Sequence, residues 1–317
     1  MDSAVLLRED ALTHLHSVQD WIRFGISLFN QSDLYYGHGT SSSLDDAVAL
    51  VLGALSLPPD LDALYFQSRL MPNEREQLLN LMIERITTRR PVAYLIGTSY
   101  FCGFPFHVDE RVLIPRSPIA ELIEESFSPW IDSEKIERIL DIGTGSGCIG
   151  IACALLLPGV MVDAVDIDVK ALEVASKNRA LYNLEDSVRL IQSSLFSGLD
   201  ADDQYDVIIS NPPYVPTSSM YTLPAEYKHE PRHALDGGED GLLFVDEILR
   251  HAAHHLTENG ILIVEVGEAQ EHLEEKYPEV PFTWLQFARG GDGVFLLTKQ
   301  ELIDYHQFFQ SNRQSKE

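Results

Sequence analysis

The stretch Asp141-Ile-Gly-Thr-Gly-Ser-Gly147 decides the fold of this chain, because it joins an apolar run to the start of a helical pattern. Three glycines at alternate positions allow the backbone to pass close to a ligand, and a helix that begins there offers free N–H groups. The overlapping segment Gly145-Ser-Gly-Cys-Ile-Gly150 also fits the dinucleotide pattern G-x-G-x-x-G. A nucleoside cofactor, a dinucleotide and a plain tight turn all remain open at this point.

Strand and helix patterns alternate from about residue 118 onward. Such alternation predicts an α/β fold with a mostly parallel sheet covered by helices on both faces. The last two strands are joined only by Arg289-Gly-Gly-Asp-Gly293, so we expect them to pair antiparallel. The expected strands are Ile139–Ile142, Val160–Ile167, Val188–Gln192, Tyr205–Ser210, Ile261–Val266, Thr283–Phe287 and Val294–Thr298, with helices such as Val169–Tyr182 and Gly241–Leu256 between them.

A carboxylate, Asp166, stands at the end of the second expected strand, and Asp168 follows two residues later. A carboxylate in this place can accept hydrogen bonds from both ribose hydroxyls of a nucleoside, and NAD enzymes use the same arrangement. Because the carboxyl ends of parallel strands meet at one edge of a sheet, four loops should line one site. These loops are residues 143–147, Asp166, residues 194–196 and residues 211–214.

The fourth expected strand ends in Asn211-Pro-Pro-Tyr214. An amide nitrogen is a poor nucleophile because its lone pair is delocalised into the carbonyl group. The Asn211 side-chain oxygen and the Pro212 carbonyl can accept its two hydrogens and direct the lone pair toward a sulfonium methyl donor. Consecutive prolines stiffen the loop, and Tyr214 can stack on a planar group. The loop therefore favours methyl transfer to an amide or amine nitrogen, whereas a dinucleotide enzyme has no need of it.

Helical periodicity dominates residues 1–90, which we expect to form a separate helical domain. Leu12, Leu15, Val18, Ile22 and Ile26 recur at helical spacing, Ser43-Leu-Asp-Asp46 can cap a helix over Ala47–Leu55, and Glu74–Thr88 forms another. The domain carries no chemical motif, so its role is a scaffold or the docking of a partner. Residues 91–117 are expected to be a β-hairpin linker built from Ser99–Val108 and Arg111–Pro115, and residues 118–317 the site-bearing domain.

The composition limits the partners and the location. A chain of 317 residues with 45% hydrophobic residues can form one large domain or two ordinary ones. Its net charge of −26 disfavours nucleic acid and suits either general solubility or a basic partner. Three cysteines without metal spacing indicate reduced thiols and a cytoplasmic location. We expect no signal peptide, because residues 1–10 lack its basic start and apolar stretch, and no membrane span, because the longest apolar run, residues 148–157, is too short.

Two histidine groups resemble metal sites without meeting the requirements of one. His229-Glu-Pro-Arg-His233 fits H-E-x-x-H, but Pro231 interrupts the helix that this zinc motif needs. The histidines at 251, 254 and 255 share a predicted helix face and lack a further ligand. We therefore predict no metal site. Arg116 is either structural or able to reach an anionic group, and the sequence does not decide between the two.

Taken together, these residues make the chain resemble the protein glutamine N5-methyltransferases. The resemblance implies a class I methyltransferase fold, which is a Rossmann-like seven-stranded sheet with a small N-terminal helical domain and a β-hairpin linker. It implies S-adenosyl-L-methionine as the cofactor. Within the family the chain is most similar to the branch that modifies the third large-subunit ribosomal protein, a basic protein substrate. The segments that carry this are Trp21-Ile-Arg23, Tyr36-Gly-His-Gly39, Phe101-Cys-Gly103, Val108–Pro118, Glu226–Pro231 and Gly290–Phe295.

The resemblance also implies a role for each matching position. Cofactor-binding residues would be Gly143, Thr144, Gly145, Ser146, Gly147, Asp166, Ser194, Leu195 and Asn211, and the acceptor pocket would be Asn211, Pro212, Pro213 and Tyr214. The family usually shows S-D-L-F or S-D-W-F where this chain reads Ser193-Ser-Leu-Phe196, so a carboxylate on the adenine side is missing. The alternatives are the release-factor enzyme of the same family, an adenine-N6 nucleic-acid methyltransferase, and a dehydrogenase or non-catalytic Rossmann-like module.

Overall fold

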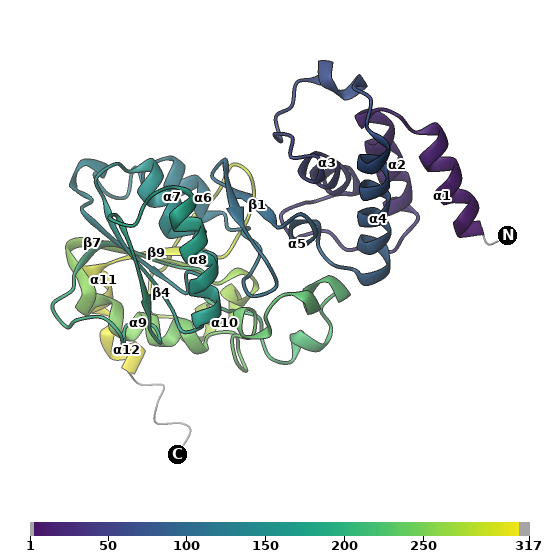
Figure 1. The fold of residues 1–317 in the computed structure, drawn as a ribbon. Coiled ribbons are helices and arrows are strands. Elements are labelled where there is room, and N and C mark those ends of the chain that lie inside the picture. Colours follow the sequence, from purple (N-terminus) through teal and green to yellow (C-terminus); the bar gives the residue numbers. More distant parts are fainter. Residues whose placement is uncertain (1–2, 311–317) are drawn as a thin grey trace. The chain divides into compact units, whose positions relative to one another are not determined.

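A computed structural model describes residues 3–310 (Figure 1). In its N-terminal region, polar residues divide the apolar pattern into separate helices. The spacing from Leu12 to Ile26 predicts one helical face, but the helix is interrupted at Ser17. The Ser17 hydroxyl accepts from the Asp20 N–H, and the Asp20 carboxylate accepts from the Ser17 N–H, which starts a new helix there. The helical elements of this region are α1 (Ser3–His14), α2 (Val18–Asn30), α3 (Ser43–Ala54), the 3-10 helix η1 (Ala63–Gln67), α4 (Pro72–Thr88) and α5 (Val92–Ile96).

Contacts between residues divide the chain into two units, each with its own core. Unit 1 contains the residues up to Ser99 together with Val108–Glu110 and Pro224–His229, and unit 2 contains the rest. The core of unit 1 is centred on α2, α3 and α4, where Trp21, Phe29 and Leu50 are fully buried. Within the described residues, no helix is both long and apolar enough to cross a membrane.

The hairpin of the linker is shorter than the sequence predicts. Strands β1 (Thr98–Phe101) and β2 (Phe104–His107) form a two-stranded sheet, and both turn residues, Cys102 and Gly103, have positive φ angles. Residues 111–115, which were expected to be part of the hairpin, form no strand. The Ile114 N–H donates instead to the carboxylate of Glu230, so this segment is held by a side chain rather than by a neighbouring strand.

Unit 2 is built on a seven-stranded sheet in the order β5-β4-β3-β6-β7-β9-β8. Strands β3 to β7 pair in parallel, and β9 pairs antiparallel with β7 and β8. This arrangement confirms the predicted α/β fold, including the antiparallel pair at the end of the chain. The strands are β3 (Arg138–Ile142), β4 (Met161–Asp166), β5 (Val188–Gln192), β6 (Tyr205–Ser210), β7 (Leu256–Glu265), β8 (Thr283–Trp284) and β9 (Val294–Thr298).

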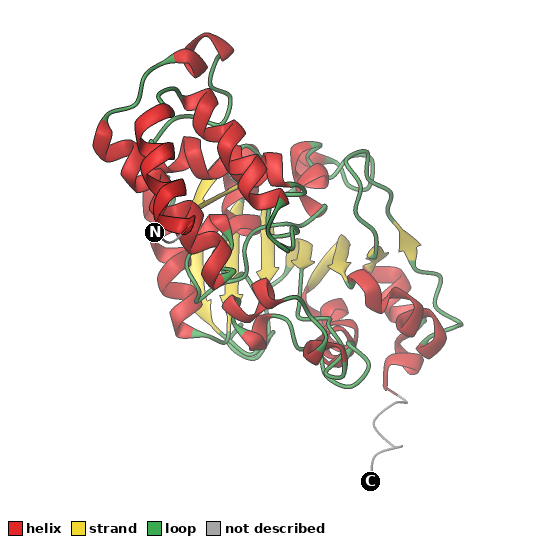
Figure 2. Cartoon of the chain, turned by 90° about the vertical axis from the view of Figure 1, so that its right-hand side faces the viewer, coloured by secondary structure: helices red, strands yellow, loops and turns green. Residues whose placement is uncertain are grey.

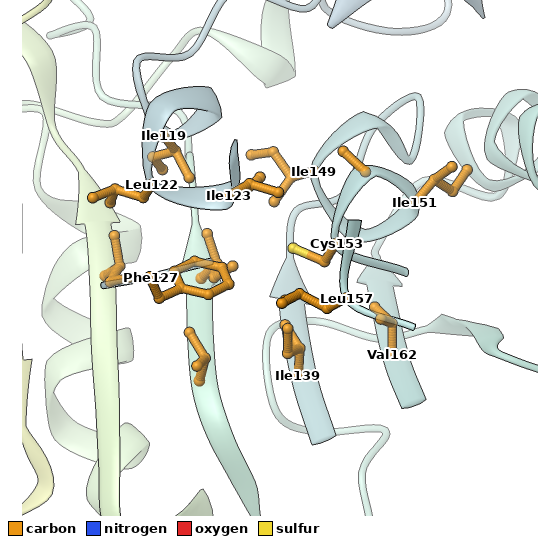
Figure 3. Packing of buried hydrophobic residues seen from close by; sticks show 14 of the residues in the cluster. Ile119, Leu122, Ile123, Phe127, Ile139, Ile149, Ile151, Cys153, Leu157 and Val162 are labelled. Carbon is orange, nitrogen blue, oxygen red and sulfur yellow. The ribbon is translucent and has the colours of Figure 1, made fainter. Parts of the chain in front are cut away.

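Apolar side chains cover both faces of this sheet. Figure 2 shows the strands of the sheet in yellow and the helices around them in red. On one face, α7 packs on β3 and β4, and α6 packs against α7. Phe127, Ile139 and Cys153 belong to the apolar cluster on this face (Figure 3). On the other face, α9 packs on β6 and β7 through residues such as Val245 and Ile248. The helices of unit 2 are α6 (Ile119–Glu124), α7 (Cys148–Leu156), α8 (Val169–Leu181), α9 (Leu243–His255), α10 (Gln270–Lys276), α11 (Lys299–Asp304) and α12 (His306–Gln310), and its 3-10 helices include η2 (Ser133–Lys135), η3 (Ser219–Tyr221), η5 (Arg232–Ala234) and η6 (Gly267–Ala269).

Candidate active site

A cavity of about 530 Å³ opens at the carboxyl ends of β3, β4, β5 and β6. All of its lining residues belong to unit 2. Ten of the predicted site residues line it: Gly143, Thr144, Gly145, Ser146, Asp166, Ser194, Leu195, Asn211, Pro212 and Pro213. The structure therefore brings the four predicted loops together at one edge of the sheet. Gly147 and Tyr214 are not among the lining residues.

The glycine-rich turn after β3 is fixed by a buried carboxylate. Asp141 Oδ2 accepts a hydrogen bond from Thr144 Oγ1 at 2.5 Å and another from the Gly150 N–H at 2.9 Å. Burial raises the pKa of Asp141 to about 6, although these two hydrogen bonds lower it. Gly143 and Gly145 have φ angles of 72° and 55°, in the left-handed region that favours glycine. An added Cβ at Gly143 would meet no atom within 4 Å, so the turn leaves open space for a ligand.

Asp166 connects the second strand to the same turn. Its Oδ2 accepts from the Gly145 N–H and its Oδ1 accepts from the Asp168 N–H, both at 2.9 Å. Burial is the main cause that raises the pKa of Asp166, and the two backbone N–H groups act in the opposite direction. An ionised carboxylate offers about four lone-pair positions, so both oxygens can still accept from a ligand. The arrangement fits the pair of hydroxyls on a ribose.

Replacing Asp166 by alanine is expected to weaken the binding of S-adenosylmethionine by roughly 100-fold, because a charged hydrogen-bond acceptor contributes about 1.5–3 kcal/mol for each bond lost. The Gly145 N–H would also lose its partner, which loosens the turn. Isothermal titration calorimetry measures the affinity directly. Asp186→Ala, which removes an exposed carboxylate elsewhere, is the matched control. An unchanged affinity in the Asp166 variant would refute the ribose assignment.

The loop after β5 lines the cavity with a hydroxyl where the resemblance implies a carboxylate. Ser194 is exposed at the cavity, and the neighbouring Ser193 holds the loop by donating to the Leu195 carbonyl at 2.6 Å. We expect Ser194→Asp to tighten the binding of S-adenosylmethionine about 10-fold, because it supplies a charged acceptor. Calorimetry should show no such gain for Ser197→Asp, which adds the same charge to the same loop away from the cavity. Equal affinities for the two variants would contradict a contact at position 194.

The Asn211–Pro213 segment is held firmly at the cavity wall. Directly before it, the Ser210 hydroxyl donates to the Ile142 carbonyl of the adjacent strand at 2.9 Å. After it, Val215 exchanges backbone hydrogen bonds with Leu235 and Gly237. Pro212 is buried and Asn211 is half-buried, and no described residue forms a hydrogen bond with the Asn211 side chain. The amide of Asn211 therefore remains available to a ligand.

Some residues in or beside the cavity had no role in the site that the sequence predicts. Arg116 pairs with Glu230 through two contacts of 2.7 and 2.6 Å and also lines the cavity, so it has a structural partner and lies next to the site. His233 also lines the cavity and lies 3.2 Å from Asp168. Glu265 is buried and accepts a hydrogen bond from the Tyr214 hydroxyl. Only the segments Val108–Pro118 and Glu226–Pro231, which carry the family resemblance, gave a signal for Arg116 and Glu230.

The residues of the H-E-x-x-H segment do not act as one group. His229 Nε2 lies 2.8 Å from the Thr88 carbonyl within unit 1, whereas His233 pairs with Asp168 within unit 2. The segment is divided between η4 (Ala225–His229) and η5, with Pro231 between them. The continuous helix that the zinc motif requires is therefore replaced by two short turns.

The chain is similar to several known methyltransferases. The family model of the methyltransferase small domain matches residues 126–238. Two relatives are named ribosomal protein uL3 glutamine methyltransferase, and both are 45% identical to this chain. The one from Francisella tularensis covers 95% of this chain and 96% of its own length, and the one from Bordetella pertussis covers 91% and 97%. A solved methyltransferase from Pyrococcus furiosus is 18% identical, covers 72% of this chain and 99% of its own, and has a TM-score of 0.43.

The match to the methyltransferase small domain and the two relatives thus identify the chain as a methyltransferase. At this level of identity over almost its whole length, the chain belongs to the family of ribosomal protein uL3 glutamine methyltransferases.

Proposed function

We propose that the enzyme transfers a methyl group from S-adenosylmethionine to the side-chain amide nitrogen, N5, of a glutamine in ribosomal protein uL3. The observation that carries the proposal is the shared cavity. The glycine-rich turn, Asp166 and the Asn211–Pro213 segment all line it, which supports a proposed nucleoside site and a proposed amide-binding loop in the same space. The two relatives that are 45% identical bear the name of this activity.

The proposed cofactor site consists of the turn at Gly143–Ser146, the carboxylate of Asp166, and the loop at Ser194 and Leu195. Open space above Gly143 and the two free acceptor positions of Asp166 support the fit. When bound, S-adenosylmethionine supplies an electrophilic methyl group on a positively charged sulfur. The residues of this chain would contribute position and electrostatics rather than a covalent intermediate.

The proposed acceptor site is the Asn211–Pro213 segment. The Asn211 side-chain oxygen and the Pro212 carbonyl would accept the two N–H groups of the glutamine amide, which turns the nitrogen lone pair toward the methyl donor. Because Pro212 is buried and the backbone on both sides is hydrogen-bonded, these acceptors need no rearrangement. A substrate without an NH2 group would leave them unpaired, at a cost of about 1–3 kcal/mol each. The role of Tyr214 in stacking on the amide stays a prediction.

Partners and location follow from the same proposal. Ribosomal proteins contact RNA and are therefore basic, and the net charge of −26 on this chain would attract such a partner at long range. The helical domain, residues 1–90, would dock the protein substrate, and the reaction would take place in the cytoplasm. We propose no direct contact with nucleic acid, because phosphate binding needs clusters of lysine and arginine.

Separate incubations with three acceptors test the function. The purified enzyme receives methyl-labelled S-adenosylmethionine and either uL3, a peptide-chain release factor or an adenine-rich oligonucleotide. We expect label only in uL3, and mass spectrometry of its peptides should show the gain of one methylene group on a glutamine. Label in the release factor alone would assign the enzyme to the other branch, and label in the oligonucleotide alone would indicate an adenine-N6 methyltransferase. Label in none of them would refute the proposal.

A further inference from the structure

Glu265, a buried carboxylate at the end of β7, accepts hydrogen bonds from two segments that border the cavity. Glu265 is only 4% exposed. Its Oε1 accepts a hydrogen bond from the Tyr214 hydroxyl at 3.0 Å, and its Oε2 accepts one from the Ser117 hydroxyl at 2.5 Å. Ser117 lines the cavity, and Tyr214 directly follows the Asn211–Pro213 segment. Both oxygens of Glu265 are therefore used to fix residues next to the site.

The ring and the backbone of Tyr214 are enclosed by glycines. A Cβ at Gly267, whose φ is +45°, would lie 2.7 Å from the Tyr214 ring, and one at Gly241 would lie 2.3 Å from the Tyr214 carbonyl oxygen. A Cβ at Gly237 would lie 2.7 Å from the Pro213 carbonyl oxygen. Contacts as short as these leave no room for a side chain. Tyr214 is thus held at its backbone, its ring and its hydroxyl.

The Tyr214 hydroxyl group contacts Glu265 rather than the cavity. Tyr214 is absent from the residues that line the cavity, and its hydroxyl points to Glu265. Burial raises the pKa of Glu265 to about 7, whereas the hydrogen bonds from Ser117 and Tyr214 and the charge of Arg116 lower it. A buried carboxylate with a raised pKa next to a cavity is the kind of group that is found at functional sites.

We propose that Glu265 is a positioning residue for methyl transfer, which acts through Tyr214 to hold Asn211–Pro213 at the cavity wall. The catalytic part of this inference rests on the proposed function. The positioning part does not, because it concerns the order of residues 211–214 in the enzyme alone. Glu265 contacts Ser117 and Tyr214 and would touch neither the methyl donor nor the acceptor amide, so its loss should lower turnover and leave the cofactor site intact.

The first test is a kinetic comparison of variants with uL3 as the acceptor. Glu265→Ala is expected to lower kcat roughly 100-fold, the typical effect of a displaced reactive group, with an unchanged Kd for S-adenosylmethionine. Tyr214→Phe removes the hydroxyl and should cause a loss of similar size. The double variant should be no slower than either single variant, because the two residues act as one unit. Glu258→Gln, an exposed position on the same strand, is the matched control and should behave as the wild type.

The pH profile separates positioning from a merely structural role. The carboxylate form of Glu265 accepts from Ser117 and Tyr214 with one oxygen each, and protonation turns one of these oxygens into a donor, so kcat of the wild type should rise with pH through about 7. Arg116 and Tyr214 are the charged and titratable groups that face Glu265, and Arg116 stays charged throughout this range. Glu265→Gln has one acceptor oxygen, as the protonated acid does, and should show a flat profile at the activity that the wild type has at low pH. A Gln variant with the unchanged profile of the wild type, or an Ala variant with the wild-type kcat, would overturn the inference.

Hydrogen exchange gives a readout that needs no acceptor. Amides in residues 211–217 should exchange faster in Glu265→Ala than in the wild type, and those in β3 should not change. If the wild type methylated no acceptor, the proposed function would fail while this measurement still tested the positioning. Equal exchange in the two proteins would overturn the positioning role. If the Ala variant does not fold, the Gln variant and its pH profile carry the test.

Discussion

Asn211→Ala is expected to lower the turnover of methyl transfer about 1,000-fold, which is the effect of removing one pre-organised hydrogen-bonding group at a reacting centre. The side chain lies in the cavity wall and no described residue competes for its hydrogen bonds. Its loss leaves one N–H of the acceptor amide without a partner, so the nitrogen lone pair is no longer directed to the methyl donor. The glycine-rich turn and Asp166 are unaffected, and the Kd for S-adenosylmethionine should stay within about 3-fold of the wild type.

Single-turnover kinetics with uL3 and calorimetry with the cofactor distinguish the two effects. Asn259→Ala, at an exposed position on β7, is the matched control and should keep full activity. Methylation by Asn211→Ala at more than about a tenth of the wild-type rate would exclude the amide-binding role, because such a loss corresponds to only about 1.4 kcal/mol. A large loss of cofactor affinity would show instead that Asn211 mainly holds the methionine end.

The sequence predicts the sheet closely where apolar runs have sharp polar borders. The structure places β5, β6 and β9 at the predicted bounds, because each run is flanked by turn residues. Two other predictions are less close. Thr283–Phe287 was expected as a strand and β8 ends at Trp284, while the expected strand Ile261–Val266 begins earlier, at Leu256. Edge strands and strand ends depend on pairing with neighbours, which the pattern of one segment does not contain.

The candidate site was predictable because of a rule about parallel sheets rather than because of single residues. Gly143, Asp166 and Asn211 lie far apart in the chain, but each stands at or directly after the end of a strand, and the carboxyl ends of these strands share one edge. Glu265 is the last residue of a strand too, yet its partners Ser117 and Tyr214 lie 148 and 51 residues away. Hydrogen bonds over such separations leave no periodic pattern in the sequence, so the positioning network becomes visible only in the structure.

A buried charge in unit 1 is a further feature that sequence periodicity does not predict. Arg85 of α4 is 2% exposed, and the 3-10 segment Pro224–His229, which belongs to the same unit, supplies its partner Glu226. Arg85 Nε donates to Asp46 at 2.9 Å, and its Nη2 donates to the Tyr35 carbonyl at 3.0 Å. Glu226 lies 3.4 Å from the guanidinium and also accepts from the Tyr35 N–H. Position 85 falls within the apolar pattern of Glu74–Thr88 but carries a cation.

Arg85→Met is expected to destabilise unit 1 by about 3–5 kcal/mol, because it leaves Asp46 buried without its cation and Glu226 with only Arg89, whose Nε lies 3.8 Å away. Asp46 and Glu226 are 2% and 1% exposed, so water does not replace the lost partner. Hydrogen exchange of α3 and α4 should show the loss in unit 1, while β3 and β6 in unit 2 keep their protection. Arg23→Met, an exposed position on α2, should change the stability by less than about 0.5 kcal/mol. Adding Asp46→Asn to Arg85→Met should recover part of the lost stability, since it removes one unpaired charge. A double variant less stable than Arg85→Met would show that packing of the Arg85 side chain, rather than its charge, holds this cluster.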